Sequence, residues 1–138
     1  MDMFNLEIIS YGISTKPSAS SIIAALNEAV EKTEDCRYRR TFHSDRGWAY
    51  QMNAYSRTLK KNRIFQSMSR KGNCYDNSVM ENFFGIMKQE MYYGALYYSY
   101  EELKDAIDKY ITYYNERRIK QKLGWKSPVE YRLTAIAA

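Results

Sequence analysis

The spacing of apolar residues in the first half of the chain predicts strands and helices in alternation. Residues 5–14 are rich in isoleucine with partial alternation, which is typical of a strand. Residues 16–35 begin with serines and continue with apolar positions at helical spacing, which predicts a helix of about four turns. Residues 38–45 then predict a second strand, 50–62 a second helix and 63–68 a short third strand.

A polar loop over 69–77 leads into a longer predicted helix from about 77 to 92. One stripe of this helix is apolar and consists of Met80, Phe83, Phe84, Met87 and Met91. A second, polar stripe consists of Asn77, Glu81, Gly85 and Lys88, at steps of four, four and three residues. Glu81 and Lys88 are therefore expected on the same polar side of the helix, about two turns apart.

Two later helices have recognisable starts. Ser99 precedes Glu102 by three residues, and Ser127 precedes Glu130 by the same interval. In such a capping box, each of the two side chains accepts a hydrogen bond from the other residue's free backbone N–H. Pro128 stands at the first helical position of the second of these helices, where its fixed φ angle is favourable.

The order of these elements indicates the fold class. Strand, helix, strand, helix and strand, followed by further helices, is typical of an α/β fold in which helices cover a mixed sheet. With 138 residues, the chain is expected to form one domain. A domain of this size buries about two-thirds of the surface that its unfolded form exposes.

Composition excludes several classes of protein. No apolar run approaches the roughly 20 residues of a membrane helix, so we expect no membrane partner. The first ten residues lack the basic start and apolar run of a signal peptide. Cys36 and Cys74 are too few for a disulfide scaffold and lack metal-ligand spacing. We therefore expect reduced thiols and a cytoplasmic location in a bacterium.

Charge is concentrated in the middle of the chain. The net charge is +5, and residues 37–73 hold ten basic side chains and one acidic side chain, Asp45. A basic stretch is equally consistent with a solvated face. A single carboxylate among ten cations nevertheless favours a site that binds polyanions and uses its one anion to hold a metal ion.

Two carboxylates are the candidates for that metal. Asp45 is expected at the C-terminal end of its strand, where open α/β sheets bind ligands. Glu81 is expected on the helix after the basic loop, with 35 residues between the two. Taken singly, Asp45 also fits the start of a turn before Arg46 and Gly47, and Glu81 also fits a solvated helix position.

Three segments carry a family resemblance: FHSDRG (42–47), GNCYDNSVMENFFGIMKQE (72–90) and YNERRIKQKLGWKSPVEY (114–131). They resemble the catalytic core of bacterial insertion-sequence transposases of the IS-three group, which are relatives of retroviral integrases. The matching positions are His43, Ser44, Asp45 and Gly47; Asp76, Asn77, Ser78 and Glu81; and Tyr114, Asn115, Arg117, Leu123, Ser127 and Pro128. Ala49 is a small departure, because many members have glutamine there.

The resemblance implies an RNase H-like fold over 1–115, followed by an extension with a short helix over 116–138. It also implies a metal-binding triad of Asp, Asp and Glu, in which Asp45 and Glu81 are the second and third members. In the family, the first aspartate lies further upstream than this chain extends, on a central strand that we expect to be absent. Asp2 matches a different, non-catalytic aspartate, so we expect an N-terminally truncated transposase.

The implied activity is DNA transposition by phosphoryl transfer, with end cleavage followed by strand transfer. Asp45 and Glu81 are the expected catalytic residues and ligands of Mg²⁺ (or Mn²⁺), which two carboxylates would hold weakly. We therefore expect the chain to be catalytically impaired. The alternatives are a non-catalytic nucleic-acid-binding remnant and an RNase H-like nuclease, and the third segment argues against the nuclease.

The resemblance and the charge pattern also suggest residues that contact DNA. These candidates are His43, Arg70, Lys71, Asn77 and Lys88. An ordinary solvated role is an equal alternative for each cation, and a structural role is an equal alternative for His43. Loss of a central strand would leave the strand at 40–44 with an unpaired edge, so we also expect a homo-oligomer that covers it, or movement of 5–14 across it.

Overall fold

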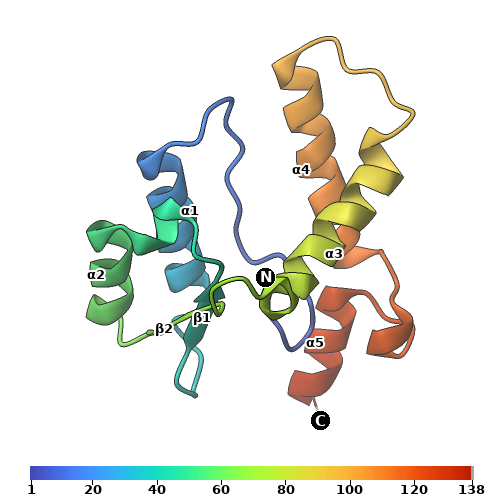
Figure 1. The fold of residues 1–138 in the computed structure, drawn as a ribbon. Helices are drawn as coiled ribbons and strands as arrows, with labels where there is room; N and C mark the ends of the chain where they lie inside the picture. The colour runs from blue at the N-terminus through green and yellow to red at the C-terminus, as the bar shows by residue number, and fades with distance from the viewer. Residues whose placement is uncertain (138) are drawn as a thin grey trace. The chain divides into compact units, whose positions relative to one another are not determined.

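The computed structural model describes residues 1–137, which divide into two compact units. One unit consists of Ser10–Asn82, and the other combines Met1–Ile9 with the described chain from Phe83 onward. Each unit is described by itself below (Figure 1). The expected boundary at residue 115 stays a prediction. No helix in the described chain is both long enough and apolar enough to cross a membrane.

The unit Ser10–Asn82 contains both strands of the described chain. Its elements are α1 (Ala19–Lys32), β1 (Thr41–Ser44), the 3-10 helix η1 (Trp48–Gln51), α2 (Asn53–Lys61), β2 (Phe65–Met68) and the 3-10 helix η2 (Cys74–Asn77). The two predicted helices and the second and third predicted strands are confirmed, with shorter bounds. Helix α1 begins after Ser18, whose side chain accepts a hydrogen bond from the backbone N–H of Ser21.

Strands β1 and β2 form a parallel pair in which His43 lies opposite Ser67 and Ser44 opposite Met68. Among the described residues, this two-stranded parallel sheet takes the place of the larger mixed sheet that the pattern predicts. The α/β class itself is confirmed. Helix α2 connects the two strands, as a parallel pair requires.

The predicted strand at 5–14 is wrong, because no residue of this segment lies in a strand. The side chain of Asn115 instead satisfies both polar groups of the Ile8 backbone. Its Oδ1 accepts from the Ile8 N–H at 2.9 Å, and its Nδ2 donates to the Ile8 carbonyl at 3.0 Å. At Ile8, therefore, the backbone polar groups bond to a side chain instead of a neighbouring strand.

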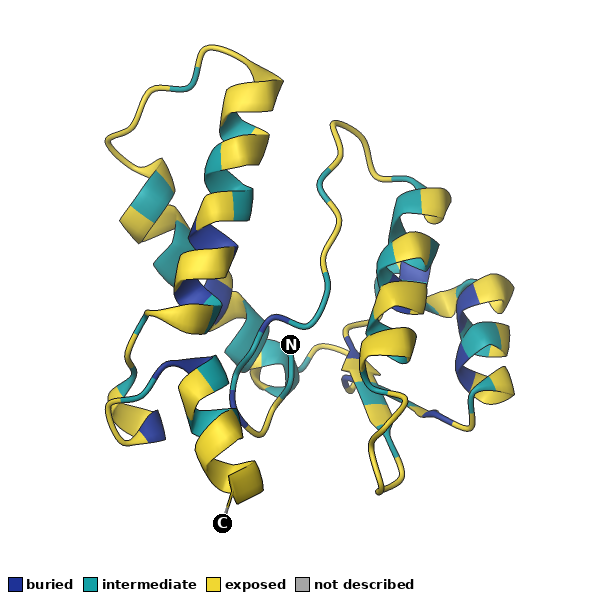
Figure 2. Ribbon diagram, turned by 180° about the vertical axis from the view of Figure 1, so that it is seen from behind, coloured by how far each residue is buried: buried dark blue, intermediate teal, exposed yellow. Residues whose placement is uncertain are grey.

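Apolar residues from α1, α2 and the position just before β2 form the core of this unit. Leu26, Tyr55, Leu59 and Ile64 are buried together, and Leu59 is only 1% exposed. In α2, Tyr55 and Leu59 are four residues apart and therefore lie on one face of the helix. This packing fixes α2 beside α1 and leaves the opposite face of α2 exposed (Figure 2).

The second unit is helical. Its elements are the end of α3 (Ser78–Met87), the π-helix η3 (Lys88–Tyr92), α4 (Tyr100–Glu116), the 3-10 helix η4 (Gln121–Leu123) and α5 (Pro128–Ala137). The ring of Phe83 packs edge-on against Tyr114, with centroids 4.9 Å apart. Tyr110 and Ile111 of α4 are also buried.

The capping box at Ser127 is confirmed in full. The backbone N–H of Ser127 donates to Glu130 Oε2 at 2.8 Å, and the backbone N–H of Glu130 donates to Ser127 Oγ at 3.3 Å. At Ser99 only half of the box forms. Ser99 Oγ accepts from the Glu102 N–H at 3.1 Å, whereas the Glu102 carboxylate accepts from Tyr98 at 2.9 Å.

Candidate metal and nucleic-acid site

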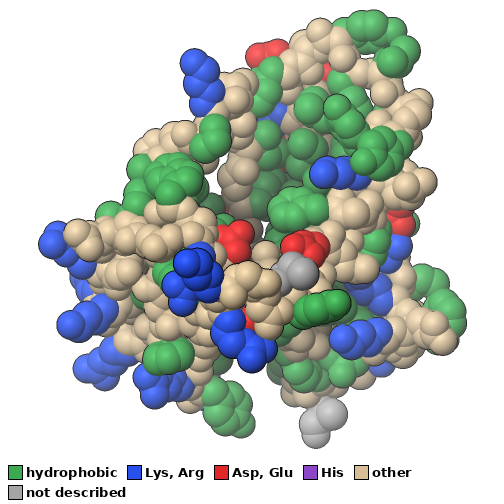
Figure 3. Space-filling model, in the orientation of Figure 1, with side chains coloured by type: hydrophobic (Ala, Val, Ile, Leu, Met, Phe, Trp, Pro, Cys, Tyr) green, Lys and Arg blue, Asp and Glu red, His purple; other side chains and the backbone are tan. Residues whose placement is uncertain are grey.

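Cations gather on the unit that contains the sheet. On the face drawn in Figure 3, Lys and Arg side chains lie over α2 and the turn that leads into β2, where Asp and Glu side chains are sparse. Not all of the ten cations in 37–73 are free to bind a ligand, because the guanidinium groups of Arg40 and Arg46 bond to backbone carbonyls of the protein. The charge pattern thus combines structural arginines with exposed ones.

Asp45 directly follows β1, as predicted, and its side chain is exposed. Its Oδ1 accepts a hydrogen bond from the backbone N–H of Gly47 at 2.7 Å. A Cβ atom on Gly47 would lie 2.9 Å from that same oxygen, so a glycine is required at this close approach. One carboxylate oxygen is therefore oriented by the turn, and the carboxylate stays open to solvent.

The negative charge of Asp45 also affects the pKa of Tyr50, a residue of η1. Burial raises the pKa of the Tyr50 hydroxyl, and the nearby negative charge of Asp45 raises this pKa further. The ring of Tyr50 lies 3.4 Å from the position that a Cβ on Gly47 would take. Asp45, Gly47 and Tyr50 thus form one tight turn after the strand.

His43 is bound to the neighbouring strand through both ring nitrogens. Its Nδ1 lies 2.9 Å from Ser67 Oγ, and its Nε2 lies 3.2 Å from Ser69 Oγ. The parallel register places Ser67 directly opposite His43. These bonds favour a structural role for the ring, although its side chain is still part of the exposed face of β1. The serines are site residues that the sequence analysis did not identify.

Hydrogen bonds from Arg70 to Asp76 close the loop between these two residues. The Arg70 backbone N–H donates to Asp76 Oδ2 at 3.0 Å, and its guanidinium lies 3.4 Å from the same carboxylate. Asn73 Nδ2 also donates to Asp76, at 3.2 Å. The hydrogen bond from the Arg70 backbone, followed by that from its side chain, holds the pKa of Asp76 below its usual value. The side chain of Arg70 remains 80% exposed.

Glu81 lies in the first turn of α3 and is exposed, as are Lys71 and Lys88. Within the described residues, the side chains of Lys71, Asn77 and Glu81 form no hydrogen bond or ion pair, so they are free to meet a ligand. The position of Glu81 near a helix N-terminus is favourable for a negative charge.

Six of the seven candidate residues lie in the unit Ser10–Asn82, namely His43, Asp45, Arg70, Lys71, Asn77 and Glu81. Lys88 belongs to the other unit. No group of three or more His, Cys, Asp or Glu side chains in the described chain is arranged to hold a metal ion. The sharing of one ion by Asp45 and Glu81 stays a prediction.

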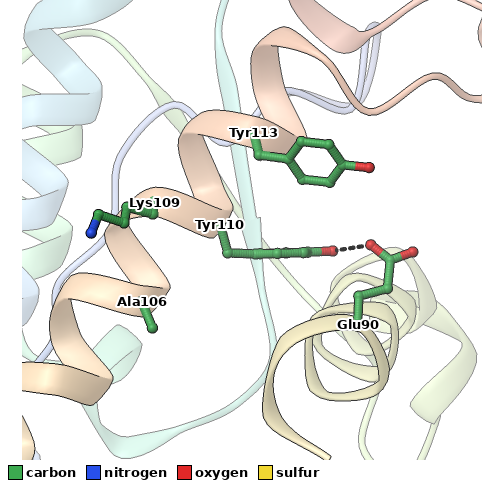
Figure 4. Close-up of a pocket in the computed structure, with 5 residues that line it drawn as sticks. All are labelled: Glu90, Ala106, Lys109, Tyr110 and Tyr113. Atoms are coloured by element: carbon green, nitrogen blue, oxygen red, sulfur yellow. Dashed lines mark hydrogen bonds between the residues drawn. The ribbon is translucent and has the colours of Figure 1, made fainter. Parts of the chain in front are cut away.

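The helical unit contains a separate, shallow groove between η3 and α4. Glu90, Ala106, Lys109, Tyr110 and Tyr113 line it (Figure 4). The Tyr110 hydroxyl donates to Glu90 Oε2 at 2.8 Å, and burial followed by this bond raises the pKa of Tyr110. Arg118 Nε donates to both oxygens of the same carboxylate, at 3.0 and 2.9 Å. The Glu90 carboxylate is therefore bonded both to Tyr110 of the groove and to Arg118.

Comparison with known proteins gives a consistent set of matches. Models described as an integrase core domain match residues 1–74 and 81–135. An uncharacterized transposase-like protein of Haemophilus influenzae is 46% identical over 135 residues, which are 98% of this chain and 62% of that protein. The putative transposase InsK for insertion sequence element IS150 of Escherichia coli is 46% identical over 96% of this chain and 46% of its own length.

A more distant relative shows the same pattern. The transposase for insertion sequence element IS904 of Lactococcus lactis is 33% identical over 132 residues, which are 95% of this chain and 52% of that protein. The chain thus matches its relatives over nearly all of its own length and spans less than two-thirds of theirs.

Proposed function

Because the chain belongs to the integrase-core family of IS-three group insertion-sequence transposases, we propose that it takes part in DNA transposition. The observation that carries the proposal is the match of both segments to an integrase core. The position of Asp45 at the end of a parallel strand supports it, since catalytic and ligand-binding groups in α/β folds gather at such strand ends.

We assign Asp45 and Glu81 as the catalytic carboxylates and as ligands of Mg²⁺ or Mn²⁺. Their chemistry fits these ions, because Mg²⁺ prefers hard oxygen donors and binds through one or two carboxylates together with substrate phosphates. Both side chains are exposed and lie in the same compact unit. A bound divalent ion would activate the attacking water or 3′-hydroxyl and stabilise the leaving oxygen of the phosphodiester.

The remaining candidates hold the DNA. Lys71 and Lys88 provide point charges for phosphate oxygens, and the exposed guanidinium of Arg70 provides a planar donor beside Asp76. Asn77 offers an amide at the end of η2, directly before α3. His43, held by two serines, supports the shape of the strand surface next to Asp45. In this assignment the candidates of the unit Ser10–Asn82 position a phosphodiester for in-line attack, and no covalent protein intermediate forms.

The fold fits the same assignment. The parallel pair β1 and β2 with the intervening α2 is consistent with part of an RNase H-like sheet. Because two carboxylates hold Mg²⁺ only weakly, we propose that Asp45 and Glu81 alone bind the ion weakly and that these residues cleave DNA poorly. We also propose that the chain forms a homo-oligomer that covers the free edge of β1.

Nicking of supercoiled plasmid DNA in Mn²⁺ tests the catalytic assignment. We expect slow nicking by the native chain and none by Asp45→Asn or Glu81→Gln, while all three proteins bind DNA. Glu34→Gln, a change at an exposed acid before β1, is the matched control and should nick as the native chain does. Equal nicking by the native chain and both site variants would overturn the assignment of these carboxylates.

A second candidate is a nucleic-acid-binding module without catalytic activity. It is favoured by the absence of a three-residue metal-ligand group in the described chain. Under this alternative, DNA binding depends steeply on salt and does not change in Asp45→Asn or Glu81→Gln, and no divalent ion promotes nicking.

A further inference from the structure

Five exposed cations gather where the two parallel strands begin. They are Arg37, Arg39, Lys60, Lys61 and Arg63, and we call them the strand-start patch. None of them belongs to the candidate site at Asp45. Because β1 and β2 are parallel, both strands begin at the same end of the sheet, opposite the end at which Asp45 lies.

The structural arginine Arg40 holds the patch together. Its guanidinium donates to the Val30 carbonyl at 2.9 Å, near the end of α1, and to the Asn62 carbonyl at 3.3 Å, just after α2. Arg39 adjoins Arg40 in the chain, and Lys61 and Arg63 flank Asn62. The Arg40–Asn62 contact therefore brings cations from two separate segments close together.

A second contact fixes Arg39. Its guanidinium carbon lies 5.2 Å from the centroid of the Phe65 ring, which is a cation–π arrangement. Phe65 is the first residue of β2 and is 50% exposed. The side chain of Arg39 is thus held beside the start of the neighbouring strand, and its charge remains accessible.

The charges of the patch are not neutralised within the protein. In the part of the chain that the structure describes, none of the five cations forms an ion pair. Three acids lie at the end of α1 and just after it, namely Glu31, Glu34 and Asp35. Since the patch has five cations, the region keeps an excess of positive charge. Exposed, unpaired cations of this kind fit a polyanion.

We propose that the strand-start patch binds the phosphate backbone of a DNA duplex at a place separate from the candidate catalytic site. This inference rests on the proposed function. Four residues of β1 separate the two ends of the sheet, a length of about 13 Å. A duplex carries one phosphate charge per about 1.7 Å of its axis, so the patch meets phosphates several base pairs away from those at Asp45.

The test compares two variants with equal loss of charge. Lys61→Gln/Arg63→Gln removes two cations of the patch, and Lys16→Gln/Lys122→Gln removes two exposed cations outside it. Binding to a fluorescein-labelled 25-base-pair duplex is followed by anisotropy over a range of salt concentrations. Each phosphate contact contributes about 0.9 to the slope of log K against log salt. We expect the slope to fall by about 1.8 in the patch variant and to stay near the native value in the control.

The outcomes separate this inference from the proposed function. Suppose that the native chain binds DNA and that nicking depends on Asp45. Equal slopes of log K against log salt in the two variants would then overturn the proposal for the patch and leave the proposed function intact. Failure of the native chain to bind any duplex would overturn both. Circular dichroism melting of each variant shows whether it is folded, and because the substituted side chains are exposed we expect native transitions.

Discussion

The Asp45 carboxylate accepts a 2.7 Å hydrogen bond from the Gly47 backbone, at a position where any side chain on residue 47 would meet the same oxygen at 2.9 Å. Gly47→Ala should therefore displace the carboxylate and weaken binding of Mn²⁺ by about tenfold, as loss of an orienting contact does at other metal sites. Electron paramagnetic resonance titration of free Mn²⁺ measures this affinity.

Gly85→Ala is the matched control for Gly47→Ala. Gly85 lies within α3, and a Cβ atom there would meet nothing within 4 Å. Alanine favours a helix over glycine by about 1 kcal/mol, so this variant should be more stable and should bind Mn²⁺ as the native chain does. Native Mn²⁺ affinity in Gly47→Ala would show that the turn does not orient a metal ligand.

Arg40 should contribute more to stability than any cation of the strand-start patch. Its guanidinium bonds to Val30, Thr33 and Asn62 and so connects the ends of α1 and α2. Hydrogen bonds from a charged group contribute about 1.5–3 kcal/mol, so Arg40→Ala should lower the free energy of unfolding by about 2 kcal/mol or more. Urea denaturation measures the change. The exposed Arg37→Ala should change it by less than about 0.5 kcal/mol.

Asn115 should be essential for the position of the N-terminal segment. Asn115→Ala leaves both the N–H and the carbonyl of Ile8 without their partner, and we expect a loss of about 1–3 kcal/mol in the free energy of unfolding. Asn115→Asp keeps the acceptor but sets a carboxylate oxygen against the Ile8 carbonyl oxygen, so it should not restore the native stability. The exposed Asn82→Ala serves as the control, and an equal effect of Asn82→Ala and Asn115→Ala would contradict the assignment.

The Glu90–Arg118 pair should make stability depend on acid pH. Hydrogen bonds from Arg118 lower the pKa of Glu90, so the contribution of this carboxylate is present above the ordinary glutamate pKa of about 4.3. It is lost as the pH falls through the lower folded-state value. Glu90→Gln should therefore be less stable than the native chain at pH 7 and nearly equal to it at pH 3. Thermal melts at the two pH values measure this.

The exposed Glu101→Gln is the control for the pH experiment. Glu101 forms no hydrogen bond or ion pair within the described residues, so this variant loses only the favourable position of a charge in the first turn of α4, about 0.3–1 kcal/mol at pH 7. A constant difference between Glu90→Gln and the native chain from pH 7 to pH 3 would indicate that packing of the side chain, and not its charge, stabilises the groove.

Local signals in the sequence predicted local structure well. The Ser127–Glu130 box and the helix predicted at 50–62 needed only neighbouring residues, and both are confirmed, the helix with shorter bounds. The segment 5–14 failed because its conformation depends on Asn115, 107 residues away from Ile8. Similarly, the bond between Arg40 and Asn62 and the partners of His43 follow from the packing of distant segments, which periodicity does not encode.

The sequence predicted only part of the candidate site. The position of Asp45 after a strand followed from its surroundings and is confirmed. The role of Asp76 in closing the loop at Arg70 was missed, although Asn73 precedes it by three residues, a spacing that suggests a local turn. The sharing of one ion by Asp45 and Glu81 stays a prediction, because it depends on side-chain positions that no sequence spacing specifies.

The parallel pairing of β1 and β2 gives the small sheet two chemically different rims. In the proposed assignment, cations at one end of the sheet bind DNA and carboxylates at the other end cleave it, with β1 and β2 between them. Substitution of the cations would therefore change the affinity for DNA without altering the groups proposed to cleave it.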